Sequence, residues 1–246
     1  MNTEVTNVIV IPSYNETLAL PQLLKDLKPG LSSMDAVIVM DDSSKEVSEE
    51  INQRCLESLA KSDFEFRFET SGTKSGRGAA IRKGMVIALA EFPNVKYLVE
   101  CDADGSHRPV DILKIKTSSS RADLLVGSRY LASSEIHGWP ISRRVFSWAL
   151  NRIIPRIMRV QLHDITNGLR RYSRIAIEKI VSEPQVNSGF IYLSEQAVHI
   201  NRAGMKIEEE PIVFVDRTLG VSTVTWREIL ASLRGVLNLF GNELKR

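Results

Sequence analysis

Two carboxylates stand one residue apart in Asp102-Ala103-Asp104, directly after the mostly apolar run at residues 95–101. A divalent cation such as Mg²⁺, held by one or two carboxylates, usually keeps positions open for substrate phosphates. Ligands of open α/β sheets lie outside the carboxyl ends of the strands. The pair therefore predicts a metal-assisted reaction on a phosphate-bearing substrate. Because aspartate is also common in turns after strands, the pair alone leaves an ordinary turn open.

Two earlier apolar runs, at residues 8–11 and 36–40, also end in polar residues. After the first run, Pro12 ends the strand pattern, Tyr14 can stack on a base, and Asn15 is a candidate cap for the next helix. After the second, Asp42 can accept hydrogen bonds from ribose hydroxyls or a base. Each loop alone is equally compatible with a capped strand-to-helix turn.

A glycine-containing turn at residues 75–80 precedes another predicted helix. Glycine lets a backbone approach closely, and a helix N-terminus favours an anion. The spacing fits neither the P-loop nor the dinucleotide-binding fingerprint, so a turn without a ligand stays open. Further along, Arg129 follows the run at 124–126 and can bind a phosphate through two hydrogen bonds.

Arginine dominates the stretch from Trp139 to Arg174, in which Asp164 is the only acid. Arg143 and Ser147 are four residues apart, so they share one helical face. Such a stretch can bind phosphates, lie at an anionic membrane surface, or form a solvated helix face. The near absence of acids to pair with the arginines weakens the last interpretation. The arginines of this stretch are Arg143, Arg144, Arg152, Arg156, Arg159, Arg170, Arg171 and Arg174.

Composition sets outer bounds on the function. The 246 residues are 43% hydrophobic and 25% charged, which favours a folded core over disorder. The net charge of +2 gives no reason to expect nucleic acid as a partner. Two cysteines make no disulfide framework, and the sequence shows neither a signal peptide nor an apolar run long enough to span a membrane. We expect a soluble or peripherally membrane-bound protein in a reducing compartment.

The pattern of elements predicts an α/β protein with a parallel sheet and right-handed crossovers. Short apolar or alternating runs alternate with helical periodicity through the first two thirds of the chain, while the last third is mainly helical. With no repeats or linkers, a single domain is the simplest organisation. Strands are expected at 8–11, 36–40, 64–68, 95–101 and 124–126, with one strand or two short ones at 207–215. Helices are expected at 15–30, 45–59, 78–89, 142–160, 173–182, 190–203 and 226–240.

The order of these motifs resembles the family 2 inverting glycosyltransferases with the GT-A fold, and most of all the soluble dolichyl-phosphate (polyprenyl-phosphate) mannosyltransferases. The resemblance implies a Rossmann-like, mostly parallel sheet flanked by helices, with a C-terminal amphipathic helix. It implies one domain over 1–246, with a nucleotide-sugar half at 1–128 and an acceptor half at 129–246. The segments that carry it are Val10–Glu16, Asp41–Ser43, Gly76–Ala80, Asp102–His107, Gly127–Tyr130, Trp139–Arg144, Asp164–Thr166 and Val215–Arg217.

The resemblance also implies a role for each matching residue. The nucleotide-sugar is expected to contact Pro12, Tyr14, Glu16, Met40, Asp42, Asp102, Ala103, Asp104 and Arg217. Mg²⁺ or Mn²⁺ is expected on Asp102, Asp104 and Ser106, and the acceptor phosphate on Arg129, Arg143 and Ser147. Among these, Asp104, Arg129 and Arg217 are expected to be catalytic.

The implied reaction transfers mannose from GDP-mannose to a polyprenyl or dolichyl phosphate, with inversion. The implied place is the cytoplasmic face of a membrane, where some relatives use a small membrane subunit. A phosphate monoester is already ionised near neutral pH, since its second pKa is about 6, so no strong general base is needed. His107 and His163 are therefore expected to be bystanders, and Glu195 and Asp164 to support the site without touching substrate.

Two departures from the family pattern keep alternatives open. Residues 44–47, Ser-Lys-Glu-Val, replace the usual Pro-Asp-Gly-Thr, which leaves the sugar and base undetermined. Thr223 stands where these mannosyltransferases usually have a lysine. A family 2 glycosyltransferase acting on a saccharide or protein hydroxyl, and a non-catalytic nucleotide-sugar-binding protein, remain alternatives. A nucleotidyltransferase is disfavoured because the expected glycine- and arginine-rich first loop is missing.

Overall fold

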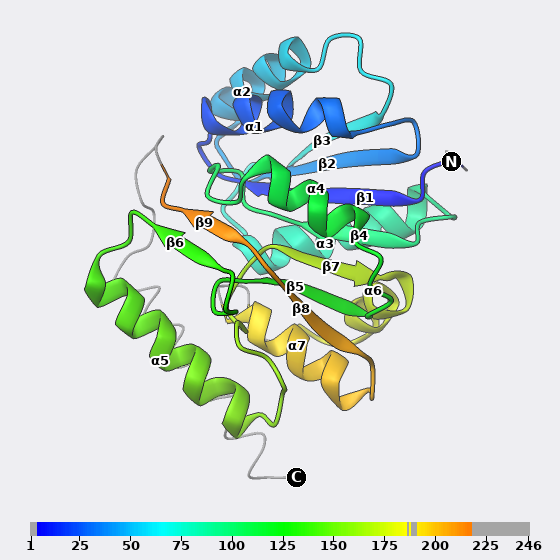
Figure 1. Ribbon diagram of the computed structural model, residues 1–246. Helices are drawn as coiled ribbons and strands as arrows, with labels where there is room; N and C mark the ends of the chain where they lie inside the picture. Colours follow the sequence, from blue (N-terminus) through cyan, green and yellow to red (C-terminus); the bar gives the residue numbers. More distant parts are fainter. Residues whose placement is uncertain (1–3, 186, 188–190, 218–246) are drawn as a thin grey trace.

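A computed structural model describes residues 4–185, 187 and 191–217, and its centre is a seven-stranded sheet (Figure 1). The strand order is β3-β2-β1-β4-β7-β5-β8, and every pairing is parallel except the two made by β7. The strands are β1 (Asn7–Ser13), β2 (Asp35–Asp41), β3 (Glu65–Thr70), β4 (Tyr97–Glu100), β5 (Leu124–Ser128), β7 (Arg170–Ser173) and β8 (Ile207–Pro211). Two further strands, β6 (Glu135–His137) and β9 (Val213–Val215), form a separate parallel pair.

Helices cover both faces of the sheet because the buried strand residues alternate between them. Val8 and Val10 of β1 pack into one apolar cluster, and Ile9 and Ile11 pack into the other. The first cluster is completed by α3 (Arg77–Glu91), α6 (Arg174–Ser182) and α7 (Tyr192–Arg202), and the second by α1 (Ala19–Leu27), α2 (Lys45–Ser58) and α4 (Pro109–Thr117). A short 3₁₀ turn, η1 (Lys28–Gly30), follows α1.

One helix, α5 (Ile141–Ile157), extends along the outside of the molecule (Figure 1). Near its C-terminal end Ile154 packs into the core, while Ile141, Val145 and Trp148 are exposed at 80%, 58% and 56%. The helix therefore packs into the core near its C-terminal end, makes polar contacts with the body nearer its N-terminal end through Arg143 and Ser147, and presents apolar side chains to solvent. In the described part of the chain, none of the helices combines the length and the apolar character needed to cross a bilayer.

The expected fold class, a mostly parallel sheet flanked by helices, is confirmed. The interior strand β7 was not predicted, because Arg170-Arg171-Tyr172-Ser173 has no apolar pattern. Its two arginines are nevertheless buried at 0% and 1% exposure. Arg170 donates to the carbonyls of Asn167, Leu193 and Ile165, and Arg171 to those of Ile115, Ser118 and Ser120. These contacts satisfy charges that would otherwise be too costly to bury.

Two smaller predictions were wrong. Asn15 does not cap α1: it has a positive φ of 60°, its backbone N–H donates to Ser43 Oγ at 2.8 Å, and α1 starts at Ala19. Arg170 and Arg171 do not belong to an exposed basic surface. The expected helix at 226–240 and Thr223 lie outside the described residues.

Candidate active site

The acidic pair Asp102 and Asp104 lies just past the carboxyl end of β4, and Arg217 comes to it from the segment after β9. Arg217 Nη2 stands 3.2 Å from Asp104 Oδ2. Glu16, from the loop after β1, shares this environment. Burial raises the pKa of Glu16, the negative charge of Asp104 adds to that rise, and Arg217 opposes it. The structure thus brings three predicted donor-site residues, Glu16, Asp104 and Arg217, into one electrostatic cluster.

Local turn geometry fixes the Asp104 carboxylate. Gly105 has a φ of +76°, which favours glycine, and the backbone N–H of Ser106 donates to Asp104 Oδ1 at 3.0 Å. Burial would raise the pKa of Asp104, but the hydrogen bonding from Ser106 and the charge of Arg217 hold it below its usual value. Asp104 is therefore an ionised, oriented carboxylate in a mostly enclosed position.

Asp102 lies between Arg77 and His107. One of its carboxylate oxygens forms an ion pair with Arg77 Nη1. Its backbone N–H donates to His107 Nδ1 at 3.1 Å, so the other ring nitrogen of a neutral His107 carries the proton and donates to Asn167 Oδ1 at 3.0 Å. Burial lowers the pKa of His107 to about 4, which keeps the ring neutral at physiological pH. His107 thus holds the backbone of the acidic pair in place.

The donor set at Asp102 and Asp104 fits a hard divalent cation that is completed by substrate. Ser106 Oγ is buried beside the Asp104 carboxylate, so it offers one further oxygen to the site. Within the same described part of the chain, no group of three His, Cys, Asp or Glu side chains forms a complete metal cage. An incomplete protein site of this kind suits a cation that also binds substrate phosphates.

Asp42, at the end of β2, is bound by the loop that precedes α3. Its carboxylate accepts hydrogen bonds from Ser71 Oγ at 2.7 Å, from the Ser75 N–H at 2.8 Å and from the Gly76 N–H at 3.0 Å. In the same loop, Lys74 Nζ stands 4.7 Å from the centre of the Tyr14 ring. Asp42 and Tyr14 are therefore on one side of the site, in contact with the 71–76 loop.

Three other predicted donor residues have mainly packing roles in this structure. Pro12 lies opposite Met40 in the parallel ladder of β1 and β2. Met40 is 3% exposed and packs near Gly84 of α3, and Ala103 is 4% exposed in the apolar cluster on the opposite face. Their backbones border the site, while the side chains of Met40 and Ala103 point into the core clusters.

Two residues predicted to bind the acceptor phosphate, Arg129 and Arg143, contact the same indole. The guanidinium carbons of Arg129 and Arg143 stand 5.1 Å and 4.2 Å from the centre of the Trp139 ring. Arg129 is 8% exposed and bound to Asp164 and Thr166, while the half-exposed Arg143 pairs with Asp216 at 2.9 Å. The third predicted residue joins indirectly, since Ser147 Oγ lies 2.7 Å from the Tyr130 hydroxyl.

Consecutive residues connect the two sides. Asp216 pairs with Arg143 of the predicted acceptor set, and Arg217 pairs with Asp104 of the predicted donor set. The segment 164–168 makes a second connection: Asp164 binds Arg129, Asn167 binds His107, and the Gly168 carbonyl accepts from Arg77. The structure therefore gathers both predicted sets of residues around one connected site.

Three residues of the site, Arg77, Glu100 and Tyr192, had no predicted role. Arg77 joins Asp102 to Glu100, which is fully buried at the end of β4, and Tyr192 donates to Glu100 from α7. The available signals were weak: an arginine inside the glycine turn and an acid inside an apolar run. Tyr192 gave no signal, because its contact with Glu100 spans 92 residues of sequence.

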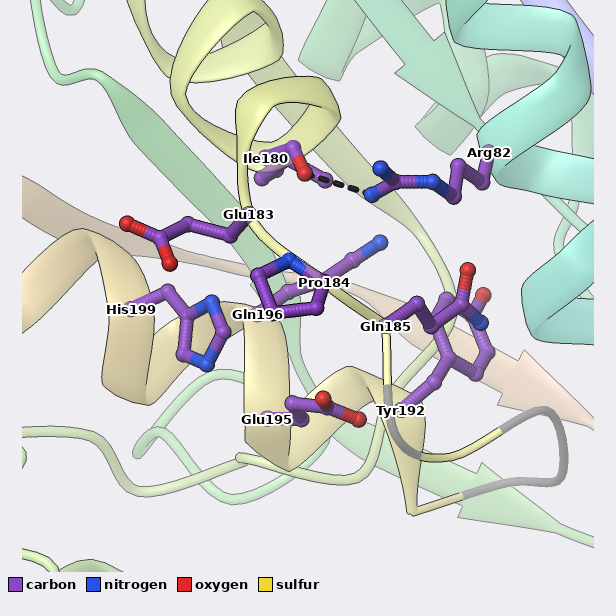
Figure 2. Close-up of a pocket in the computed structure, with 9 residues that line it drawn as sticks. All are labelled: Arg82, Ile180, Glu183, Pro184, Gln185, Tyr192, Glu195, Gln196 and His199. Carbon is purple, nitrogen blue, oxygen red and sulfur yellow. Dashed lines mark hydrogen bonds between the residues drawn. The ribbon is translucent and has the colours of Figure 1, made fainter.

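Glu195 and His163, which were not expected to touch substrate, bind other residues of the protein. The backbone and side-chain amides of Asn187 donate to the buried Glu195, and the exposed His163 pairs with Glu209 at 2.8 Å. Glu195 also lines a small hollow between α6 and α7 (Figure 2). That hollow offers about 10 Å³, room for about one water molecule.

The sequence matches the model of glycosyl transferase family 2 over residues 8–181. It is 34% identical over 217 residues to the undecaprenyl-phosphate mannosyltransferase of Micrococcus luteus, covering 88% of this chain and 86% of that protein. It is 32% identical over 224 residues to the polyprenol monophosphomannose synthase of Mycolicibacterium smegmatis, covering 90% and 82%.

Solved structures show the same fold at low sequence identity. Glucosyl-3-phosphoglycerate synthase from Mycobacterium tuberculosis, in complex with Mn²⁺ and UDP, superposes with a TM-score of 0.64 at 16% identity, covering 95% of this chain and 77% of that one. A Pyrobaculum calidifontis mannosyltransferase in complex with GDP-Man and Mn²⁺ gives 0.62 at 16% identity, covering 98% and 64%. From the family match and the two relatives, the chain belongs to glycosyl transferase family 2 and is a glycosyltransferase.

Proposed function

We propose that this enzyme transfers mannose from GDP-mannose to a polyprenyl phosphate, with inversion and with Mg²⁺ or Mn²⁺ bound at Asp102, Asp104 and Ser106. The two relatives above carry polyprenyl-phosphate mannose transfer in their names and match most of this chain. The observation that carries the proposal is the Asp216-Arg217 link, which joins a donor-side carboxylate to an acceptor-side arginine through adjacent residues. Such a link suits a reaction in which both substrates carry phosphate.

The donor would lie along the carboxyl ends of β1, β2 and β4. Pro12, Tyr14, Met40 and Asp42 would border the nucleotide, and Glu16 and Ala103 the sugar diphosphate. A bound divalent cation would neutralise the charge that grows on the departing diphosphate. Arg217 would exchange its ion pair with Asp104 for a contact to that diphosphate, adding fixed positive charge at the leaving group.

The acceptor would enter from the side of α5. Arg143, half-exposed, would exchange Asp216 for the acceptor phosphate, and Ser147 would donate a hydrogen bond to it. Burial would lower the pKa of Arg129, but Asp164 raises it, so Arg129 stays charged while Asp164 and Thr166 orient it. A phosphate oxygen then attacks the anomeric carbon from the face opposite the leaving diphosphate. The bond between the anomeric carbon and the diphosphate oxygen would break as the new carbon–oxygen bond forms, and the nucleoside diphosphate would leave.

A membrane surface is the proposed source of the acceptor, at the cytoplasmic face. The exposed side chains of α5 and the following turn combine large apolar residues with arginines, and no acid occurs between Trp139 and Asp164. This combination favours the interface of an anionic bilayer. The apolar members are Ile141, Val145, Phe146, Trp148, Ile153 and Ile157, and the basic ones are Arg144, Arg152, Arg156 and Arg159. A small membrane subunit would add to this attachment.

The proposal is tested by incubating the protein with a panel of nucleotide-sugars, Mn²⁺ or Mg²⁺, and polyprenyl phosphate in competition with saccharides. Selection of GDP-mannose and formation of a mannosyl lipid phosphate is the expected outcome. Transfer to the saccharides alone would instead establish a hydroxyl acceptor. Binding of a nucleotide-sugar with no transfer to any acceptor would make the chain a non-catalytic relative.

A further inference from the structure

Glu100 is a buried carboxylate for which the proposed reaction has no use. It lies at the end of β4, two residues before Asp102, with 0% of its surface exposed. Arg77 Nη2, at 2.8 Å, and the Tyr192 hydroxyl donate to one of its oxygens, and the Tyr172 hydroxyl donates to the other at 3.1 Å. These partners come from α3, β7 and α7. Burying a carboxylate charge is costly unless it is paired, and these partners pair it.

Arg77 is shared between Glu100 and the proposed metal ligand Asp102. Its Nη2 binds Glu100, its Nε donates to the Tyr192 hydroxyl at 3.0 Å, and its Nη1 pairs with Asp102. The guanidinium also donates to the Gly168 carbonyl at 3.3 Å. Arg77 thus connects the buried acid to the ligand.

The space around Arg77 is tightly shaped. A Cβ at Gly168 would lie 2.4 Å from Arg77 Nη2, and a Cβ at Gly78 would lie 2.8 Å from Tyr192 Cγ. Figure 2 shows Tyr192 beside Gln185, and Gln185 Nε2 would lie 2.6 Å from the same Gly78 Cβ. Gly168 therefore allows its backbone to lie against the Arg77 guanidinium, and Gly78 allows Tyr192, which binds Arg77, to pack close to α3.

The positive charge of Arg77, next to Asp102, opposes the binding of a cation there. Its charge repels an incoming cation and competes with that cation for the carboxylate. Glu100, Arg77 and Asp102 together carry −1, whereas Arg77 and Asp102 without the Glu100 charge carry 0. A unit charge several ångströms away, at the effective dielectric of a protein interior, changes a cation's affinity by roughly tenfold or more.

We infer that Glu100 is a positioning residue for the cation site: it neutralises and anchors Arg77, and so leaves the Asp102 carboxylate available to a divalent cation. The inference rests on the proposed function, because that proposal puts the cation at Asp102 and Asp104. It adds that the site depends on a charge that never touches the metal or the substrates.

The test is a titration of the full chain with Mn²⁺ alone, followed by electron paramagnetic resonance of the free ion. Glu100→Gln keeps the size of the side chain and removes its charge, and its Mn²⁺ affinity should fall about tenfold. The matched control Tyr172→Phe removes a hydrogen bond to Glu100 but keeps the charge, and its affinity should equal that of the wild type. Thermal unfolding of each variant reports any loss of stability separately.

The double variant Arg77→Gln/Glu100→Gln removes both charges and restores −1 at Asp102. Its Mn²⁺ affinity should return to within about threefold of the wild type, which a purely structural role for Glu100 would not produce. The double variant also decides the matter if Glu100→Gln alone does not fold: affinity well below that of the wild type would overturn the inference.

The outcomes separate this inference from the proposed function. Unchanged affinity in Glu100→Gln, together with lost binding in Asp104→Asn, would overturn the role of Glu100 and leave the cation site standing. Absence of Mn²⁺ binding in the wild type, both with the metal alone and with GDP added, would overturn the proposed cation site and the inference with it.

Discussion

Arg129 and Asp164 form a two-point ion pair in the protein interior. Arg129 Nε and Nη2 each stand 2.8 Å from a different oxygen of Asp164, and the Arg129 N–H donates to the same carboxylate at 2.9 Å. Arg129 is 8% exposed and Asp164 is fully buried. A residue predicted to bind the acceptor phosphate is therefore anchored by an acid whose predicted role was only to support the site.

Asp164→Asn should destabilise the fold by about 3–5 kcal/mol of unfolding free energy, because it leaves the Arg129 charge buried without its partner. Denaturant unfolding measures this loss. The control is Glu178→Gln, which removes an exposed pair with Arg174 at the same 2.8 Å distance. That change should cost less than about 1 kcal/mol. Equal losses in the two variants would contradict the account of the buried pair.

The same pair predicts a pH dependence. Burial would raise the pKa of Asp164, but Arg129 and its hydrogen bonds hold that pKa below the usual value. A carboxyl with a lowered folded-state pKa adds stability at pH values above its unfolded pKa of about 4, and this stability is lost as the pH falls through the folded pKa. The stability difference between the wild type and Asp164→Asn should therefore be constant from pH 5 to 7 and shrink below about pH 4. A stability difference that grew as the pH fell below 4 would contradict a lowered pKa for Asp164.

Asp104→Asn should lower the transfer rate by about a thousandfold, since it removes a charged ligand of the proposed cation and the partner of Arg217. Chelation of divalent ions should inactivate the wild type reversibly, with Mn²⁺ or Mg²⁺ restoring the rate. Steady-state kinetics with saturating substrates measure both effects. Asp63→Asn, on the exposed loop before β3, is the control and should behave as the wild type. Full activity of Asp104→Asn with metal present would refute the mechanism.

Arg143→Ala should raise the KM for polyprenyl phosphate by about tenfold or more, because a charge-assisted contact to the acceptor phosphate is lost. The KM for the nucleotide-sugar should not change. The assay uses neutral detergent micelles, so that attraction to an anionic bilayer does not contribute. Arg152→Ala, on the same helix, serves as the control and should leave both constants unchanged. An unchanged lipid-phosphate KM in Arg143→Ala would exclude Arg143 from the acceptor site.

Trp148→Glu should weaken binding to anionic vesicles by about tenfold, because it replaces an exposed apolar side chain of α5 with a like-charged one. Flotation with vesicles containing anionic lipids at low salt measures the bound fraction. Val110→Glu in α4, also exposed, is the control for a hydrophobic-to-acid change elsewhere. Equal flotation of all three proteins would place the membrane contact away from α5.

The sequence predicted the parallel strands and the loops at their carboxyl ends, because β-branched runs and turn residues are local signals. It could not predict β7, because Arg171 is stabilised by carbonyls more than 50 residues away and Arg170 by carbonyls of the neighbouring loop and of α7, which the fold alone brings to it. For the same reason Arg170 and Arg171 were grouped with the phosphate-binding candidates, although in the structure they are buried and bind backbone carbonyls. The Glu100–Arg77–Asp102 chain likewise depends on side chains that the fold alone brings together. The types and order of the residues indicated where the site lies, but only the structure identified the ion-pair partners of its charged side chains.

The most direct measurement is mass analysis of the lipid after incubation with GDP-mannose, polyprenyl phosphate and Mn²⁺. The account predicts a polyprenyl phosphate heavier by one hexose, formed by the wild type and not by Asp104→Asn. A wild-type protein that binds GDP-mannose and leaves the lipid phosphate unchanged would contradict it.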